Sequence, residues 1–156
     1  MSISSADESL LKQWFNERDA DAFKAICSRH AGMVYATCLR ILRNETEAED
    51  VVQSCFESLS GLRKRPRGPL GPWLHKVATN RALDVLKSDK RRKAREEGFF
   101  VGRESHTEIL WEDIYEFVDE AIEELPEKLR VALVAHFLED ETHESIARRE
   151  GVSRAA

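Results

Sequence analysis

Apolar residues that recur every three or four positions predict helices along most of the chain. The longest such run lies between residues 20 and 42, and Asp19 is positioned to cap its N-terminus. Its apolar stripe comprises Phe23, Cys27, Val34, Cys38 and Ile41, with Ile26, Met33 and Leu39 on the flanks. Because Cys27 and Cys38 are eleven residues apart, or about three turns, we expect both thiols to face the core.

Two Ser/Thr-x-x-Glu sequences in the N-terminal part resemble capping boxes and predict further helix starts. Ser5 and Glu8 would begin a helix near residues 6–17. Thr46 and Glu49 would begin another, whose buried face is expected to be Val51, Val52, Cys55, Phe56 and Leu59.

The stretch between this helix and the next combines prolines, glycines and positive charge. Residues 63–72, RKRPRGPLGP, cannot be helical throughout, and we expect a loop followed by a helix with Pro72 at its first position. The core face of that helix would be Leu74, Ala78, Ala82, Val85 and Leu86. Its polar face would be Lys76, Asn80, Asp84, Lys87, Arg91 and Arg95. Trp73 falls on the polar side, so it could stack on an unpaired base or cover an apolar gap under the loop.

The C-terminal third predicts three more helices. A capping box at Ser105 and Glu108 would begin the first, which Pro126 would end while beginning the second. The apolar stripe of the first is expected to be Ile109, Leu110, Ile114, Phe117, Val118, Ala121 and Ile122. Thr142 would cap the third helix, over residues 143–149.

The end of the sequence is typical of a helix-turn-helix. Ile146 and Ala147 would face inward, Gly151 would end the helix in a left-handed conformation, and Val152 would pack into the angle. Ser153 would cap a recognition helix of which three residues follow, too few to repay helix nucleation.

Composition favours a helix-rich protein with a real core. The 156 residues are 42% hydrophobic and 34% charged, enough for one compact domain or two small ones. Without a long apolar run or a signal-peptide pattern, we expect no membrane insertion. The three cysteines, an odd number, suggest reduced thiols and a cytoplasmic protein.

The net charge of -5 conceals a strong segregation along the chain. Residues 1–60 carry 6 Lys/Arg and 10 Asp/Glu, residues 61–103 carry 13 and 4, and residues 104–156 carry 5 and 15. A basic block between acidic ones is typical of a local polyanion site, although a solvated helix face would look the same.

No set of residues predicts catalysis or a bound cofactor. Cys27 and His30 do not complete a metal site, and His136 and His143 lack a third ligand at a suitable spacing. The sequence has neither a glycine-rich phosphate loop nor a recognisable nucleophile set. We therefore expect neither an enzyme nor a metal or other cofactor.

Three blocks, in order, resemble the extracytoplasmic function (ECF) sigma factors of bacterial RNA polymerase. They are residues 22–56, residues 71–92 (GPWLHKVATNRALDVLKSDKRR) and residues 118–153. The resemblance implies an all-α fold of two small helical domains, a four-helix sigma domain two and a helix-turn-helix sigma domain four. We expect the first over residues 1–95, a linker over 96–105 and the second over 106–156.

The resemblance also implies roles for named residues. Glu49, Asp50 and Gln53 would dock on the clamp helices of the polymerase largest subunit. The promoter minus-ten element would be opened and bound, with one base flipped into the loop, by Arg65, Arg67, Trp73, Lys76, Asn80, Arg81, Lys87, Arg91 and Arg92. An anti-sigma factor is a further expected partner. The acidic residues also suit the dipole of their helix, which is a purely structural explanation.

Reading of the minus-thirty-five element would need the recognition helix, so we expect that function to be lost in a shortened chain. The alternative is a helix-turn-helix DNA-binding regulator that does not depend on polymerase docking. A module that binds only an acidic regulator protein through its basic block also remains open.

Overall fold

The computed structural model describes residues 3–98 and 111–152, and within these ranges every element is helical. The elements are α1 (Ile3–Glu17), α2 (Ala20–Leu42), α3 (Glu45–Gly61), α4 (Leu70–Glu96), α5 (Trp111–Glu124), α6 (Glu127–Leu133), the π-helix η1 (Val134–Leu138) and α7 (His143–Glu150). The prediction of an all-α fold is confirmed.

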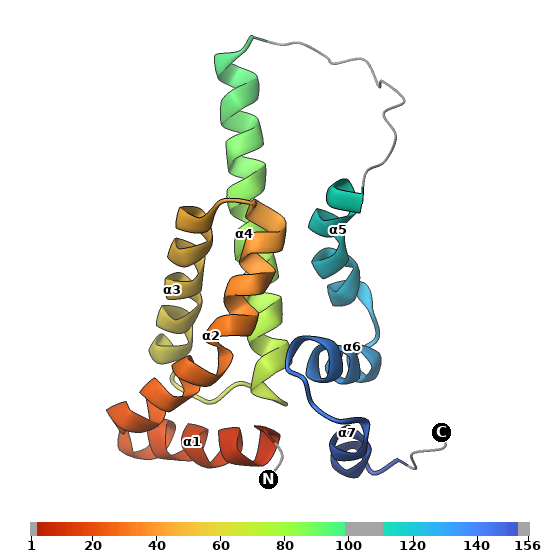
Figure 1. Cartoon of the computed structure of the whole chain (residues 1–156). Coiled ribbons are helices and arrows are strands. Elements are labelled where there is room, and N and C mark those ends of the chain that lie inside the picture. The colour runs from red at the N-terminus through yellow and green to blue at the C-terminus, as the bar shows by residue number, and fades with distance from the viewer. Residues whose placement is uncertain (1–2, 99–110, 153–156) are drawn as a thin grey trace.

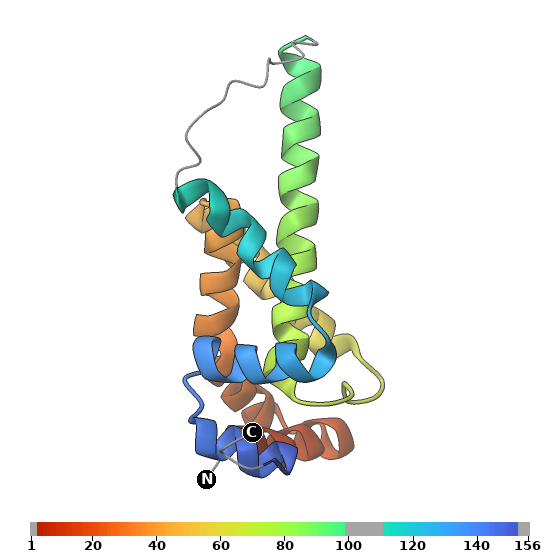
Figure 2. The same cartoon turned by 90° about the vertical axis from the view of Figure 1, so that its right-hand side faces the viewer.

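Helices α2, α3 and the first half of α4 form a bundle, and α1 crosses one end of it (Figure 1). The α5–α7 segment lies on the side of the bundle away from α3, where α5 contacts α2 and α4, and η1 contacts α4 (Figures 1 and 2). The second half of α4 projects beyond the bundle (Figure 1).

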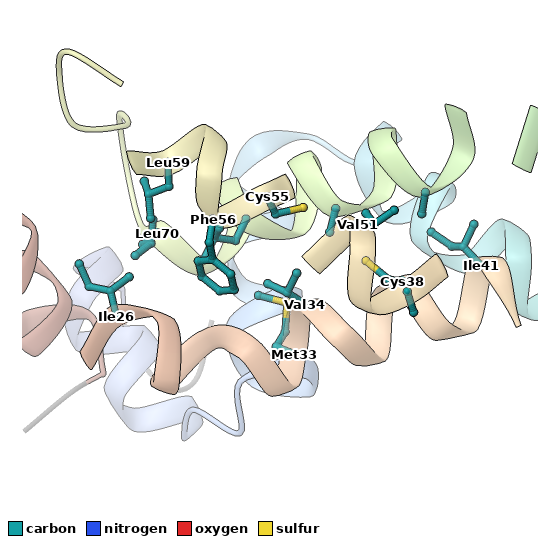
Figure 3. Close-up of a cluster of buried hydrophobic side chains, with 14 of the residues drawn as sticks. Ile26, Met33, Val34, Cys38, Ile41, Val51, Cys55, Phe56, Leu59 and Leu70 are labelled. Atoms are coloured by element: carbon teal, nitrogen blue, oxygen red, sulfur yellow. The ribbon is translucent and has the colours of Figure 1, made fainter. Parts of the chain in front are cut away.

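The core lies between α2, α3 and α4. Figure 3 shows the side chains from α2 meeting those of α3 and of Leu70 at the start of α4. Cys38 and Cys55 are fully buried there, and burial raises the pKa of their thiols to about 12 and about 11, so both behave as small apolar groups. Cys27 is only half-buried, although it packs against the same cluster.

Helix boundaries follow the predictions in part. The Asp19 carboxylate accepts from the backbone N–H groups of Asp21 and Ala22, so that cap is confirmed. The two other N-terminal capping boxes are wrong. Helix α1 already begins at Ile3, and α3 begins at Glu45 because the side chain of Asn44 accepts from the N–H of Glu47.

The loop before α4 is shorter than predicted. Helix α4 begins at Leu70, so Pro72 is its third residue and the predicted loop residues 70–72 are helical. The first N–H groups of a helix have no partner within it, so a proline in the first turn loses no helical hydrogen bond. Gly68 supplies the left-handed turn of the loop, with φ 76°.

Helix α5 buries a different face from the one predicted. Its expected core residues Ile114, Phe117 and Val118 are 37%, 55% and 37% exposed, and of the described stripe residues Ile122 is buried. The face turned to the bundle instead carries Asp119, because α2 and α4 present Arg40 and His75 at this place. The predicted capping box at Ser105, with Ile109 and Leu110, lies outside the described residues.

The predicted first helix of the helix-turn-helix is present. Thr142 accepts from the N–H of Ser145, Ile146 is buried, and Gly151 has φ 66°. The expectation that Val152 packs into the angle is wrong, since its side chain is 54% exposed. Ser153 and the expected recognition helix lie outside the described range.

Candidate nucleic-acid interface and docking surface

The outer face of α4 carries a row of exposed polar side chains, most of them cationic. Lys76, Asn80, Lys87 and Arg91 are exposed, as predicted from the helical spacing, and so is Arg92. Arg91 donates to the backbone carbonyl of Lys87 at 3.2 Å, which aligns its side chain along the helix. Arg92 forms an ion pair on the same helix, since its guanidinium lies 3.4 Å from the Asp89 carboxylate. Several cations on one projecting helix are suited to the phosphates of a nucleic-acid strand.

The loop between α3 and α4 forms one wall of a cavity of about 460 Å³. Its other wall comes from α1, where the lining residues are Asp7, Glu8 and Leu11. Arg65 and Arg67 of the loop line the cavity, and Arg65 makes a 3.3 Å ion pair with Glu8. The contribution of α1 was not predicted, because nothing in the spacing of residues 3–17 relates them to a loop some sixty residues later.

Trp73 lies at the end of the first turn of α4, directly after this loop. It is half-buried and packs against the core cluster of the bundle. Trp73 therefore covers apolar side chains with part of its surface, which agrees with a packing role, and the rest of its surface remains accessible. A role in base stacking stays a prediction.

Arg81 differs from the other predicted DNA-binding residues. Its guanidinium is half-buried and donates hydrogen bonds to the hydroxyl groups of Ser54 and Ser58 on α3. Arg81 therefore joins α3 to α4, whereas Lys87 and Arg91 extend into solvent.

The predicted docking residues lie on α3. Glu49, Asp50 and Gln53 are exposed, and the Gln53 amide donates to the Glu57 carboxylate at 2.8 Å. These positions are one turn apart and form an acidic ridge, defined here as Glu49, Asp50, Gln53 and Glu57.

The helix dipole does not explain this ridge. The acidic residues in the first turn of α3 are Glu45 and Glu47, and the influence of the dipole falls off within that turn. Glu49 and Asp50 follow it and point into solvent. A docking role for the ridge stays a prediction.

The described parts of the chain contain neither a membrane-spanning helix nor a metal-binding cluster. No helix there is long and apolar enough to cross a membrane. No group of three or more His, Cys, Asp or Glu side chains there is arranged to hold a metal ion.

Comparison with known proteins gives two family matches in chain order. The protein-family model described as Sigma-70 region 2 matches residues 26–92, and the family model described as Sigma-70, region 4 matches residues 117–156. The first match contains α3 and all but the last turn of α4, and so both the acidic ridge and most of the basic helix.

Individual relatives are sigma factors by name. RNA polymerase sigma factor CarQ of Myxococcus xanthus is 38% identical over 80 residues, which are 49% of this chain and 45% of the relative. ECF RNA polymerase sigma factor SigW of Bacillus subtilis is 33% identical over 79 residues, 46% of this chain and 40% of the relative. ECF RNA polymerase sigma factor RpoE of Cereibacter sphaeroides is 26% identical over 152 residues, 92% of this chain and 82% of the relative. The first two matches thus span less than half of each relative.

Proposed function

Because the chain belongs to the ECF RNA polymerase sigma factors, we propose that it binds core RNA polymerase and directs promoter recognition and melting for transcription initiation. One observation carries this proposal. The acidic ridge on α3 and the cationic face of α4 are separate exposed surfaces of one rigid bundle. Such a bundle can contact a basic protein and a DNA strand at the same time.

The acidic ridge is the proposed polymerase-docking surface. Glu49, Asp50 and Gln53 would meet the clamp helices of the polymerase largest subunit. Their exposure supports this role, because no intramolecular packing would have to be disrupted on docking. Opposite charge on the partner would accelerate encounter and fix the orientation of the complex.

The basic face of α4 and the adjacent loop are the proposed promoter-binding surface. Lys76, Asn80, Lys87, Arg91 and Arg92 would follow the phosphates of the non-template strand. The cavity beside Arg65 and Arg67 would receive a flipped base, and the accessible part of Trp73 would stack on a neighbouring one. Extrusion of a base costs a few kcal/mol, which stacking of about 1–3 kcal/mol per base and the phosphate contacts can offset.

The alternative, a helix-turn-helix regulator that works without polymerase, is not favoured. Such a regulator needs neither an acidic ridge nor the loop and basic helix that the Sigma-70 region 2 match contains. Two finer expectations remain proposals that rest on the family alone. They are an anti-sigma factor as a further partner and the cytoplasm as the place of action.

Direct binding to core RNA polymerase tests the proposal. A fluorescently labelled chain should bind core polymerase saturably, and added salt should weaken the complex, because charged surfaces meet. Asp50→Arg should lower the affinity strongly, whereas Glu144→Arg, an exposed acidic position on α7, should leave it nearly unchanged. Absence of saturable binding, or an equal loss in both variants, would contradict the docking proposal.

A further inference from the structure

Buried ionic side chains join the α1–α4 bundle to the α5–η1 segment. His30 of α2 has a side chain that is only 2% exposed. Its Nε2 lies 2.8 Å from Oδ2 of Asp7 on α1, and its Nδ1 lies 3.0 Å from Oε1 of Glu139, the residue that follows η1. Both ring nitrogens thus face carboxylate oxygens. A neutral imidazole has one N–H, so only the protonated ring can donate to both carboxylates.

The charge environment of His30 favours this protonated form. Burial alone would lower the pKa of His30, but the hydrogen bonds to Asp7 and Glu139, with their negative charges, outweigh burial and raise it to about 9. Among the described residues, Arg29 on α2 also lies here, with its guanidinium 3.5 Å from the second oxygen of Asp7. Two carboxylates from different elements are therefore held together by one imidazolium, with one guanidinium at the edge.

The Glu139 carboxylate also lies tightly against the start of α4. A methyl group added at Gly71 would lie 2.1 Å from Oε2 of Glu139, far closer than any van der Waals contact allows. Glycine at this position therefore lets the carboxylate reach the N-terminus of α4, where the helix dipole also favours a negative charge. The π-turn of η1 and the left-handed conformation of Asp140, with φ 54°, present Glu139 at this place.

A second ionic cluster, around His75, is of a different kind. His75 of α4 contacts Asp119 at 2.8 Å and Glu123 at 2.7 Å, both on α5. Arg40 of α2 binds Asp119 at 2.7 Å, and Arg130 of α6 lies 3.1 Å from Glu123. Each carboxylate here keeps an arginine partner whatever the charge of the histidine, so this cluster would persist after deprotonation of His75.

We propose that His30 is a proton-dependent latch that holds the turn after η1, through Glu139, on the ends of α1 and α4. When His30 loses its proton, one of its two carboxylates is left without a donor in a buried place, and Glu139 leaves for solvent because it belongs to a surface turn. The arginine pairs of the second cluster keep α5 docked. The latch thus governs the segment from η1 to α7, not the whole fold.

The latch connects this segment to the cavity. Asp7 is both the partner of His30 and part of the cavity wall, and Gly71 directly follows the last residue that lines the cavity, Leu70. Release of Glu139 would therefore change the charge balance at Asp7. If the cavity receives a promoter base, as proposed above, docking of the C-terminal segment and base binding are coupled. This consequence rests on the proposed function, whereas the latch itself does not.

The sign of the pH dependence follows from the raised pKa. A group whose pKa is higher in the folded protein stabilises the folded state fully below its ordinary pKa, here 6.5. That stabilisation is lost as the pH rises through the folded value of about 9. The latch is therefore closed at neutral pH and opens in the alkaline range.

Proton NMR of the His30 ring, assigned by comparison with His30→Gln, tests the charge state. We expect a titration midpoint near pH 9 that falls toward about 6.5, the ordinary value for histidine, in Glu139→Gln. The control Glu144→Gln, at an exposed carboxylate of α7, should leave the midpoint unchanged. A wild-type midpoint near 6.5, or one that Glu139→Gln does not move, would overturn the proposal.

Hydrogen exchange at pH 7 tests whether the Glu139 contact holds the turn after η1 in place. Gly71→Ala pushes the Glu139 carboxylate off its position and should raise exchange over residues 134–142 by about tenfold or more, the factor for losing a charge-assisted hydrogen bond. Gly32→Ala, in a helix and with open space around it, is the matched control and should change nothing there. Equal protection in Gly71→Ala and the control would overturn the latch. Neither experiment uses polymerase or DNA, so their outcome is independent of the proposed function.

Discussion

The guanidinium of Arg81 on α4 donates a hydrogen bond to the hydroxyl of Ser58 on α3, so the two helices with the proposed binding surfaces are joined by their own side chains. A second bond runs from Arg81 to Ser54 one turn earlier. The contact fixes how the acidic ridge of α3 is set relative to the cationic face of α4. A residue expected from the sequence to touch DNA thus also positions the surfaces.

Removal of this contact should cost stability. In Arg81→Ala, both serine hydroxyls lose a charged donor within a half-buried contact, and we expect a loss of about 1–3 kcal/mol in the free energy of unfolding. Chemical denaturation followed by circular dichroism measures it. Arg91→Ala, at an exposed position of the same helix, is the control and should leave the free energy of unfolding nearly unchanged. Equal stability of both variants would show that Arg81 has no joining role.

Trp73 packs against the core and is partly accessible, and Trp73→Leu separates its packing role from its proposed stacking role. Leucine keeps apolar contact with the core but cannot stack on a base, so binding of a single-stranded minus-ten segment should weaken by about 1–3 kcal/mol. Affinity for core polymerase alone should stay the same. Fluorescence anisotropy of labelled DNA and of labelled protein measures the two affinities. Unchanged DNA binding would return Trp73 to a purely structural role.

The two surfaces should be separable by mutation. Asp50→Arg combined with Gln53→Ala places positive charge on the acidic ridge and should weaken polymerase binding at least about tenfold, because like charges then meet across the interface. Binding of isolated single-stranded DNA should remain, since the cationic face of α4 is unaltered. Both affinities can be measured by titration of the same protein preparation. A parallel loss of both would contradict the division between α3 and α4.

Salt dependence should reveal which cations of α4 contact phosphate. Replacing Arg91 by Gln should reduce the slope of log affinity for single-stranded DNA against log salt concentration by about 0.7, the value for one phosphate contact. Arg92→Gln should reduce it less, because Arg92 is already paired with Asp89. Lys12→Gln on α1, also exposed, is the control with no expected change. If neither substitution in α4 changes the slope, these cations do not contact the phosphates and the proposed DNA interface on α4 is wrong.

The cysteines should differ in reactivity. Burial raises the pKa of Cys38 to about 12 and that of Cys55 to about 11, so neither forms appreciable thiolate at neutral pH. We expect a thiol reagent at pH 7.5 to modify Cys27 alone in the folded protein, and slowly, because burial raises its pKa as well. All three should react in denaturant. Rapid reaction of a thiol in folded Cys27→Ser would contradict the buried environment of the other two.

Apolar periodicity and capping residues predicted the helices whose bounds and buried faces depend on neighbouring positions in the sequence. The bounds of α2, its Asp19 cap and most of the buried face of α3 follow from apolar periodicity and one capping side chain, and the structure agrees except that Val52 is only half-buried. The capping boxes at Ser5 and Thr46 failed because other residues begin these helices earlier.

Helix α5 shows what periodicity cannot decide. Its apolar stripe predicts which residues share a face, but not what that face meets. The partner helices offer Arg40 and His75, so Asp119 is buried and Phe117 is exposed. The contacts of His30 with Asp7 and Glu139 join residues separated by 23 and 109 positions, and no local pattern links them.

The most direct test of the account is binding of the purified chain to core RNA polymerase with and without forked DNA. The fork would carry a randomised, unpaired minus-ten strand, since the preferred sequence is to be selected in the same experiment. We expect saturable, salt-sensitive binding to polymerase that the fork strengthens, with one family of minus-ten sequences enriched. Absence of polymerase binding, together with tight binding to intact duplex DNA, would contradict it and favour a regulator that acts without polymerase.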